Sequence, residues 1–393
     1  MKLEKSETNN AIITELCSVR KHPNADRLNL ATVLGAQVIV GLDAKDGDLV
    51  IYFDSNLKLS PEYLHCNNLY SSKELNADPT KSGYFGKNGR VRAQKFRGEI
   101  SNGYVAELGS LNMIPGVVVN GIGMYWSSGT EFTSINGVEI CSKFVVPTKH
   151  TQGQPRPVIS EMFHKHWDTK QLMRELGSIP EDAICYIEEK IHGTHGRTGN
   201  VLCKISRPWW KFWGPVEEWK VISGTRRVDN ISYHIPAVRL EIERRIAPHL
   251  HKGEEVYYEI YGYVGGKQIQ TGFPYDCRGG EFKVVLYRVT ITSLDGVCYD
   301  LSRKQVYRRA EELGLEKPYL IEICDQGDYL VDYVQGICKG KSHLDSSTLC
   351  EGVVVWFEDS YGNWGCLKHK SEEFLLSQDK RYEKGEGDVE DEL

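Results

Sequence analysis

The sequence predicts an α+β fold in two domains, the first rich in strands and the second built from strands and helices in alternation. A chain of 393 residues is longer than one domain usually is. Its first part carries short apolar runs such as AQVIVGL and DLVIYF, bounded by Gly, Asp and Asn, which is typical of strands. After residue 160, strand and helix patterns alternate. We expect domains at residues 1–145 and 161–380, a linker at 146–160, and an acidic disordered tail at 381–393.

Composition predicts the linker and the tail. Residues 146–158 read VPTKHTQGQPRPV and are rich in Pro, Gly and polar side chains, as linkers are. The tail after Lys384 reads GEGDVEDEL, and its five acidic residues favour disorder.

Periodicity and end signals predict the elements of the second domain. Helices are expected at residues 169–176, 238–250 and 304–313. Ser302 is a suitable N-cap for the last of these helices. Strands are expected at residues 183–189, 256–263, 282–292 and 353–358.

Composition and charge exclude several classes of protein. Hydrophobic residues make up 40% and charged residues 26%, as in ordinary globular chains. The sequence contains no run of about 18 apolar residues, so it predicts no membrane span. The polar start MKLEKSETNN lacks a signal-peptide core. The 11 cysteines contain no CxxC pair, which predicts reduced thiols in the cytoplasm or another reducing compartment. A net charge of -6 argues against a simple nucleic-acid coat protein, but it leaves local phosphate contacts open.

The segment EEKIHGTH around Lys190 is the sharpest motif in the chain. Lys190 follows a predicted strand and precedes a Gly turn; taken alone, such a lysine is usually a solvated surface residue. Three more segments follow in order: YYEIYG with Glu259, EGVVV with Glu351, and LKHK with Lys368 and Lys370. The last two lysines alternate along a strand, so both point to one of its faces.

This order of motifs resembles the covalent nucleotidyltransferase superfamily of ligases and mRNA capping enzymes. The first motif of that superfamily is usually K-x-D-G; this chain has K-x-H-G, which resembles the E-K-x-H-G-T form of the phage nick-sealing RNA ligases. The resemblance covers roughly residues 180–375. It implies an ATP-grasp-like ligase domain of antiparallel sheets with flanking helices, in which Lys190 carries AMP as a covalent intermediate.

The implied reaction explains why these residue types are needed. A lysine attacks the α-phosphate of ATP only as a neutral amine, and its reference pKa is about 10.4. Nearby positive charge and partial burial must therefore lower the pKa of Lys190. Lys368, Lys370 and a metal ion, Mg²⁺ or Mn²⁺, are the implied sources of that charge. They also stabilise the negative charge that builds on the phosphate.

The resemblance also implies roles for the other site residues. Glu351 would hold the metal through water, since Mg²⁺ prefers oxygen ligands, and Glu259 would contact the ribose hydroxyls or a metal-bound water. Tyr287, in VVLYRV, would stack on adenine. The residues around the nucleophile that would shape the nucleotide site are Glu189, His192 and Gly193.

Each of these residues also has a simpler structural interpretation. Glu259 could be a satisfied core carboxylate, and Tyr287 could be ordinary core packing. Glu351 could open a plain turn. Lys368 and Lys370 could line an exposed sheet edge that discourages aggregation.

Ligases of this superfamily place an arginine after the first motif, where it contacts the nucleotide or the accepting phosphate. Arg226 and Arg227, in SGTRRV, are the candidates, because the planar fork of Arg matches phosphate. The sequence does not decide between them. Residues 207–214, RPWWKFWG, form an apparent insertion before them. Its four aromatics and two cations suit either a stacking platform for RNA bases or a hairpin packed on its own domain.

The first domain carries two segments that resemble the tRNA-binding OB modules of synthetase accessory domains. HPNADRL, starting at His22, matches their H-P-N-A-D-x-L start, and KFRGEISNG matches their late K-x-R-G-x-x-S-x-G. An OB barrel offers a groove for single strands. Arg90, Arg92, Lys95 and Arg97 would supply phosphate contacts. These four side chains could also be a solvated basic face, and the HPNAD turn could merely close the barrel.

The order of the domains narrows the expected family. DNA ligases and capping enzymes carry an OB domain after the fifth motif, whereas only 23 residues follow Lys370 and the expected OB module comes first. This order resembles the RNA ligase family with an N-terminal OB domain, whose members join a 3′-OH RNA end to a 5′-phosphate, often at a nick in a duplex. We expect a monomeric ATP-dependent RNA ligase that acts through lysyl-AMP and AMP-capped RNA in RNA repair. The alternatives are a GTP-dependent capping-type guanylyltransferase and a catalytically dead RNA-binding protein.

Overall fold

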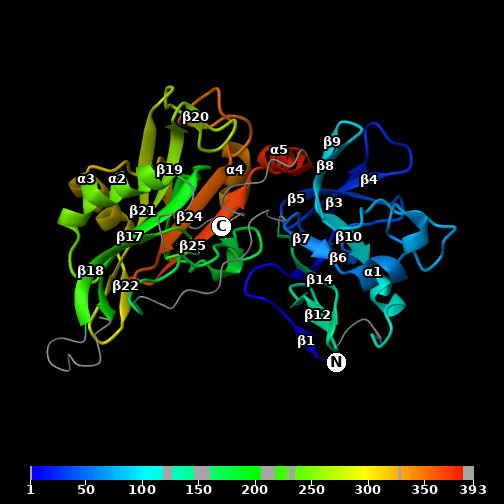
Figure 1. The fold of residues 1–393 in the computed structure, drawn as a ribbon. Coiled ribbons are helices and arrows are strands. Elements are labelled where there is room, and N and C mark those ends of the chain that lie inside the picture. The colour runs from blue at the N-terminus through cyan, green and yellow to red at the C-terminus, as the bar shows by residue number, and fades with distance from the viewer. Residues whose placement is uncertain are drawn as a thin grey trace. The chain divides into compact units, whose positions relative to one another are not determined.

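The structure is a computed structural model that describes most of the chain. The described residues are 2–117, 126–145, 160–204, 217–226, 228–229, 235–325 and 329–383. Residues 146–159 of the expected linker at 146–160, the aromatic segment 207–214, Arg227 and residues 384–393 lie outside them. Residues 381–383 of the tail expected at 381–393 are described and form the end of a helix. The chain divides into two compact units, one of Met1–Val146 with Glu372–Glu386 and one of Pro147–Ser371 with Gly387–Leu393 (Figure 1).

The first unit is built mainly from short strands. These strands are β1 (Leu3–Glu4), β2 (Ala11–Glu15), β3 (Cys17–Lys21), β4 (Asn29–Val33), β5 (Ala36–Val40), β6 (Leu49–Phe53), β7 (Leu57–Leu59), β8 (Ala93–Phe96), β9 (Glu99–Asn102), β10 (Tyr104–Glu107), β11 (Glu131–Phe132), β12 (Ser134–Ile135), β13 (Val138–Glu139) and β14 (Cys141–Lys143). The helices are α1 (Pro61–Cys66), α5 (Glu372–Glu383) and the 3₁₀ helices Lys73–Leu75 and Leu108–Met113.

The described strands of this unit pair into separate small sheets. A four-stranded sheet has the order β10-β6-β2-β11, and a three-stranded sheet has the order β3-β4-β5. The other sheets are the three-stranded β1-β12-β13 and the two-stranded β14-β7 and β8-β9. The prediction of a β-rich first domain is therefore confirmed. These described strands form no closed barrel, so the OB-fold stays a prediction.

The four-stranded sheet is apolar on both faces. In β6, Ile51 and Phe53 pack into one core cluster, whereas Val50 and Tyr52 pack into a second one on the opposite face. Successive side chains of a strand point to opposite faces. The uninterrupted apolar run LVIYF therefore corresponds to a strand that is covered on both sides.

Helix α5 belongs to the first unit, although it follows the last strand of the second unit directly. Its Asp379 forms a buried ion pair with Arg90 and accepts a hydrogen bond from the Ala93 N–H (2.6 Å). The expected second domain at 161–380 included most of this helix. The structure places it with the first unit instead, because the partners of its buried face lie almost 300 residues earlier in the chain.

The second unit is built around two β-sheets. Its described strands are β15 (Lys170–Gln171), β16 (Ile184–Glu189), β17 (Thr194–Lys204), β18 (Glu217–Gly224), β19 (Glu254–Val264), β20 (Lys267–Gln268), β21 (Phe282–Thr292), β22 (Cys298–Asp300), β23 (Leu320–Asp325), β24 (Gly352–Glu358) and β25 (Trp364–Lys370). One sheet has the order β15-β25-β24-β16-β23, and the other has the order β18-β17-β19-β21-β22 with β20 beside β19. Only β15 and β25 pair in parallel among the described strands of this unit.

Helices pack on one face of each sheet (Figure 1), and side chains of the other face line a cavity. The helices of this unit are α2 (Pro236–Ile246), α3 (Arg303–Leu313), α4 (Tyr329–Ile337) and the 3₁₀ helices Leu176–Ser178 and Ala247–His249. In β21, Leu286 packs into the core with α2 and α3, whereas Val285 and Tyr287 line the cavity. In β24, Val355 joins the core with α4, whereas Trp356 lines the same cavity. Strand alternation therefore directs one set of side chains into the space between the sheets.

The structure confirms one expected helix and corrects another. Helix α3 begins after Ser302, whose side chain accepts the Gln305 N–H in a capping box, and it ends at Gly314 in the left-handed conformation. The helix expected at residues 169–176 is wrong, because β15 pairs with β25 at its start and turns follow. That pairing joins segments almost 200 residues apart, so local periodicity carries no sign of it. None of the described helices is long and apolar enough to span a membrane.

The pair of Arg90 and Asp379 tests how α5 is held. Asp379→Ala leaves a buried guanidinium without its carboxylate and removes the acceptor of the Ala93 N–H. We expect the free energy of unfolding of the first unit to fall by about 3 kcal/mol. The urea dependence of amide hydrogen exchange in β6 measures this change. Lys380→Ala, at an exposed position of the same helix, should change it by less than about 0.5 kcal/mol. Equal effects of the two substitutions would show that this pair does not hold the helix.

Candidate active site

A cavity of about 120 Å³ lies between the two sheets of the second unit. The expected site residues that line it are Glu189, Lys190, Arg226, Glu259, Tyr287 and Lys368. Ion pairs join Glu351 and Lys370 to this group. The structure therefore brings together side chains that are spread over almost 200 residues of sequence.

Lys190 stands in the turn that follows β16. Its N–H donates to Gly352 O (2.9 Å), and the N–H of the preceding Glu189 donates to Tyr319 O (2.9 Å). These two bonds hold the backbone of the turn, one to the start of β24 and the other to the residue before β23. The Lys190 side chain keeps 25% of its surface exposed. The amine is held in place and still open to a substrate.

A hydrogen bond joins Gly193, three residues after Lys190, to the side chain of Glu259 in β19. The Gly193 N–H donates to Glu259 Oε1 (3.0 Å). A Cβ added at Gly193 would lie only 2.3 Å from Ile260 O, so the turn requires glycine. One oxygen of Glu259 is satisfied, as the simpler interpretation expects. Its side chain nevertheless lines the cavity and is only half-buried.

Two lysines and a histidine surround the buried carboxylate of Glu351. Its Oε1 lies 2.9 Å from Lys190 Nζ and 3.4 Å from Lys370 Nζ, and its Oε2 lies 3.7 Å from His192 Nδ1. Burial alone would raise the pKa of Glu351, but the charges of Lys190, Lys370 and His192 lower it to about 2. The carboxylate is ionised at neutral pH and orients the Lys190 amine. Glu351 is therefore more than the start of a plain turn.

Lys368 lines the cavity from a central strand. Strand β25 lies between β15 and β24, so the interpretation of Lys368 as part of an exposed edge is wrong. Burial, followed by the charges of Lys370, Arg226 and Lys190, lowers the pKa of Lys368 to about 7. Clustered cations in a partly buried place are the arrangement expected for binding phosphate groups.

Tyr287 is fixed at the cavity wall by two histidines. Its hydroxyl is hydrogen-bonded to His195 Nδ1 at 2.6 Å, and the His166 ring meets it edge-on with centroids 5.4 Å apart. Burial, followed by the charges of Arg226 and Arg197, holds the pKa of His195 far below its usual range. The His195 imidazole is therefore neutral, and its hydrogen bond holds the half-buried ring of Tyr287 in one orientation beside the cavity.

Arg226 is the arginine of the candidate pair that the structure describes. It lines the cavity, and its Nη2 lies 2.5 Å from Asp168 Oδ1. Asp168 is exposed, so the ion pair lies at the rim where a phosphate can compete for the guanidinium. Arg227 lies outside the described residues.

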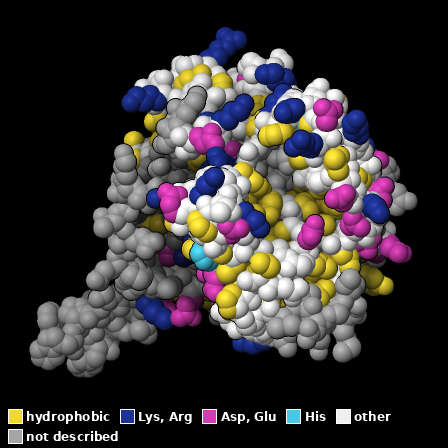
Figure 2. Space-filling view, turned by 90° about the vertical axis from the view of Figure 1, so that its right-hand side faces the viewer, with side chains coloured by type: hydrophobic (Ala, Val, Ile, Leu, Met, Phe, Trp, Pro, Cys, Tyr) yellow, Lys and Arg dark blue, Asp and Glu magenta, His cyan; other side chains and the backbone are white. Residues whose placement is uncertain are grey.

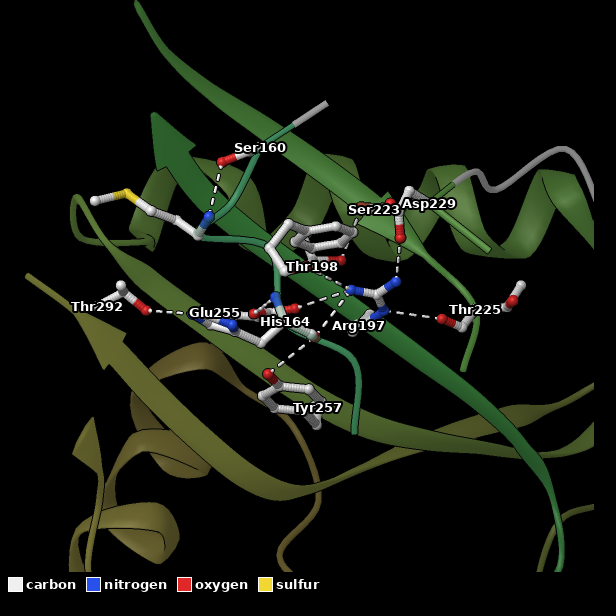
Figure 3. A network of polar contacts seen from close by, with 12 residues as sticks. Ser160, His164, Arg197, Thr198, Ser223, Thr225, Asp229, Glu255, Tyr257 and Thr292 are labelled. Atoms are coloured by element: carbon white, nitrogen blue, oxygen red, sulfur yellow. Dashed lines mark hydrogen bonds and ion pairs between the residues drawn. The ribbon is translucent and has the colours of Figure 1, made fainter. Parts of the chain in front are cut away.

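Arg197 anchors two segments that border the cavity, and we did not predict it. Fully buried in β17, it donates from Nε to Thr225 O (2.9 Å) and from Nη1 to His164 O (2.9 Å), and it pairs with Asp229 (Figure 3). These bonds hold the residue before Arg226 and the chain leading to His166. Arg197 lies two residues after His195, on the same face of the strand. That alternation is the signal in the sequence that could have revealed it.

The donor set fits a metal that is held partly by water and substrate. No three His, Cys, Asp or Glu side chains of the described residues cluster closely enough to hold a metal ion by themselves. Glu351 Oε2 and Glu189 Oε1 are buried, and neither accepts a hydrogen bond from a described residue. Mg²⁺ commonly binds one or two carboxylates together with waters and substrate phosphates. Glu351 matches that pattern. Glu259 is half-buried at the cavity wall and already accepts the Gly193 N–H.

The two motifs of the first unit meet at the β8–β9 hairpin. Asn24 Nδ2 donates to Arg97 O (2.9 Å), Arg97 Nη1 donates to Asn24 O (3.2 Å), and His22 Nε2 lies 3.3 Å from Phe96 O. Lys95, Phe96 and Arg97 are exposed there. The HPNAD turn and the KFRG segment, about seventy residues apart, therefore build one surface.

Two of the four basic residues expected on this surface have other partners. Arg90 is buried between the rings of Phe144 and Tyr382, each 4.5 Å from its guanidinium carbon, and it does not fit a phosphate contact. Arg92 pairs with Glu383. On the face seen in Figure 2, Lys and Arg side chains are interspersed with Asp and Glu side chains. That face does not present a field of a single sign.

Comparison with known proteins identifies the fold. No family model matches the sequence, and no curated protein matches it. Solved structures match over nearly the whole chain, and they are RNA ligases.

These structures are of the Naegleria gruberi RNA ligase. A lysine variant with ATP and Mn is 15% identical at a TM-score of 0.61, and the match covers 95% of this chain and 99% of that chain. The structure with PPi is 15% identical at a TM-score of 0.62, covering 94% and 99%. A further lysine variant with AMP and Mn is 15% identical at 0.63, covering 94% and 99%. The chain therefore has the fold of these RNA ligases.

Lys368→Met tests the charge state of the cavity. The pKa of Lys368 is about 7 in the folded chain and near its ordinary value of 10.5 in the unfolded chain. Between these values the unfolded chain binds a proton that the folded chain lacks, so the stability of the wild type rises with pH across that window. The variant lacks this slope. We expect the free energy of unfolding of the wild type, measured by urea denaturation, to increase relative to that of Lys368→Met between pH 7 and 10.

The exposed Lys380→Met is the matched control and should keep the slope of the wild type. Parallel pH curves for the wild type and Lys368→Met would contradict the lowered pKa of Lys368.

Proposed function

We propose that this chain is an ATP-dependent RNA ligase that carries AMP on Lys190 and joins 3′-OH and 5′-phosphate RNA ends. The observation that carries the proposal is the convergence of Lys190, Glu351, Lys368 and Lys370 at one cavity. The fold supports it, because RNA ligase structures described with ATP, AMP and PPi share this fold.

The first step forms a bond between Lys190 Nζ and the α-phosphorus of ATP. The bond from that phosphorus to the pyrophosphate oxygen breaks, pyrophosphate leaves, and the amine loses its proton to solvent. Glu351 is too weak a base to keep this proton, because its pKa is about 2; at 2.9 Å it aims the amine instead. Lys368 and Lys370 supply positive charge where negative charge builds on the phosphate.

A divalent metal fits beside Glu351, through the buried oxygen that accepts no hydrogen bond from the described residues. When bound, Mg²⁺ or Mn²⁺ supplies positive charge that neutralises the phosphates and favours the uncharged amine. The carboxylate of Glu351 would be shared between the lysines and the hydration shell of the ion.

The cavity supports adenine as the base. Tyr287 offers a fixed ring at its wall. Glu189 also lines the cavity, and its buried Oε1 accepts no hydrogen bond from the described residues, while Oε2 accepts the His343 N–H (2.9 Å). The exocyclic amino group of adenine is a donor that suits Oε1, whereas guanine carries a carbonyl oxygen at that position. Two facing acceptors repel, so the pocket favours ATP over GTP.

Two further steps complete the reaction on RNA. An oxygen of the 5′-phosphate attacks the phosphorus of lysyl-AMP, the N–P bond breaks, and Lys190 regains its amine proton. The 3′-OH then attacks the 5′-phosphorus, loses its proton and releases AMP. Arg226 can exchange Asp168 for a phosphate during these steps. Lys95 and Arg97 would contact the RNA backbone as exposed cations of the first unit.

The biological setting follows from these ends. We infer that the chain acts as a monomer in RNA repair, where it would rejoin strands that hydrolysis has left with a 3′-OH and a 5′-phosphate. All 11 cysteines are free thiols, which suits the cytoplasm or another reducing compartment.

The paired side chains argue against a catalytically dead RNA-binding protein. A protein that only binds RNA does not need an ionised, buried Glu351 between two lysines. Such a carboxylate is costly to bury without a function.

Covalent labelling tests the proposal directly. With α-labelled ATP and Mg²⁺ or Mn²⁺, we expect the wild type to gain label on Lys190. Lys190→Ala should gain none, because the nucleophile is absent, and a chelator should abolish the labelling of the wild type. Gel detection of labelled protein and peptide mapping give the readout. Lys165→Ala, at an exposed position, is the control. Unlabelled wild type, or equal label on Lys190→Ala, would refute the ligase proposal.

A comparison of nucleotides tests the pocket. At equal concentration we expect label from ATP to exceed label from GTP by about 100-fold, since an unpaired buried acceptor facing an acceptor is heavily penalised. Burial raises the pKa of Glu189, so the assay is run at pH 8, an alkaline pH that favours the deprotonated carboxylate, which is an acceptor. Equal labelling by GTP would favour the guanylyltransferase alternative.

A further inference from the structure

Two exposed aromatic rings stand beside the candidate nucleophile. Tyr319, 40% exposed, and His343, also exposed, have ring centroids 6.0 Å apart and planes inclined by 19°. Both are tied to Glu189, the residue before Lys190. The Glu189 N–H donates to Tyr319 O (2.9 Å), and the His343 N–H donates to Glu189 Oε2 (2.9 Å). The backbone of each ring-bearing residue is therefore bonded to the residue before the nucleophile.

The pair is held in this position and is not part of the nucleotide cavity wall. Pro318, just before Tyr319, lines the cavity, so the chain leaves the wall as it reaches the tyrosine. On the other side, His343 Nε2 lies 3.3 Å from Ile337 O, which limits rotation of the imidazole. Exposed parallel rings that are fixed by their backbone lose little conformational freedom when a third planar group stacks on them.

The loop that carries His343 exposes two lysines next to it. Lys339 and Lys341 are exposed in it, and Lys341 Nζ donates to Ser347 O (3.0 Å). Asp345, in the same loop, accepts hydrogen bonds from the Ser347 and Thr348 hydroxyls. Aromatic faces next to lysines are the combination that binds single-stranded nucleic acid without reading its sequence.

We propose that Tyr319 and His343 form a stacking platform for the terminal nucleobase of the RNA strand that bears the 5′-phosphate. This inference rests on the proposed ligase function. In AMP transfer that phosphate must reach the AMP group on Lys190, and in sealing it must stay in the same site while the 3′-OH attacks it. Its own base is the planar group closest to it. The 3′-OH strand is needed only in the last step. The platform therefore acts in AMP transfer and in sealing, and it does not act in the formation of lysyl-AMP.

The test separates the nucleotide step from the RNA steps. Enzyme loaded with AMP is mixed in single turnover with 5′-phosphorylated RNA, offered as a single strand and at a nick. A second RNA lacks the base of its 5′-terminal nucleotide. The variants are Tyr319→Ala, Tyr319→Phe and His343→Ala, the last of which keeps the N–H that contacts Glu189. Tyr361→Ala, at a position 88% exposed, is the control.

The expected result is a loss of AMP transfer of roughly tenfold for Tyr319→Ala and His343→Ala, with unchanged labelling by ATP. Tyr319→Phe and Tyr361→Ala should match the wild type, because the first keeps a planar ring. The abasic RNA should slow the wild type by a similar factor and should slow Tyr319→Ala no further.

Three outcomes would overturn the platform. The alanine variants could transfer AMP like the wild type, they could lose labelling by ATP as much as transfer, or the abasic RNA could slow every variant equally. If the wild type forms no lysyl-AMP, the ligase proposal itself fails. Fluorescence anisotropy with the same two RNAs then decides the platform separately: tighter binding of the intact RNA that Tyr319→Ala abolishes supports it, and equal binding refutes it.

Discussion

The buried carboxylate of Glu351 between Lys190 and Lys370 is the interaction on which the candidate site depends. A carboxylate in this place is stable as an anion only because two ammonium groups offset its lost hydration. The contact requires β24 and β25 to approach closely at Gly352, where a Cβ would lie 2.0 Å from His369 O. Backbone packing at one glycine thus makes the charge cluster possible, and the charge cluster orients the amine that we propose as the nucleophile.

A buried arginine that is bonded to both sheets helps to fix the width of the cavity between them. Arg303 donates to Glu188 of one sheet (3.0 Å from Nε) and to Tyr287 O of the other sheet (2.7 Å from Nη1). This buried arginine therefore links the two sheets next to the residues that line the space between them. Arg197 plays a similar part for the segments that carry His166 and Arg226. Two buried arginines, neither of them expected from the sequence, hold the walls around the expected side chains.

Local patterns led to side chains that the structure then places together. Lys190, Glu259 and Lys368 were found because each stands on a recognisable strand or at its end, and the structure brings all three to one cavity. Prediction failed where a partner is distant: β15 (Lys170–Gln171) pairs with β25 in place of the expected helix, and Asp379 of α5 pairs with Arg90. Arg197 was missed for the same reason, because a buried arginine in a strand has no meaning until its acceptors are known.

The sequence by itself determined which side chains alternate along each strand and where α3 is capped, because periods of 2 and 3.6 and a Ser-to-Gln capping pair are local properties. It also determined the order of the motifs, on which the resemblance to ligases depends. Only the tertiary structure decided that these side chains share one cavity and that Glu351 is ionised between two lysines. It also decided that Arg90 is buried under α5. Burial and the charges of neighbours depend on contacts between distant segments, and no local pattern contains them.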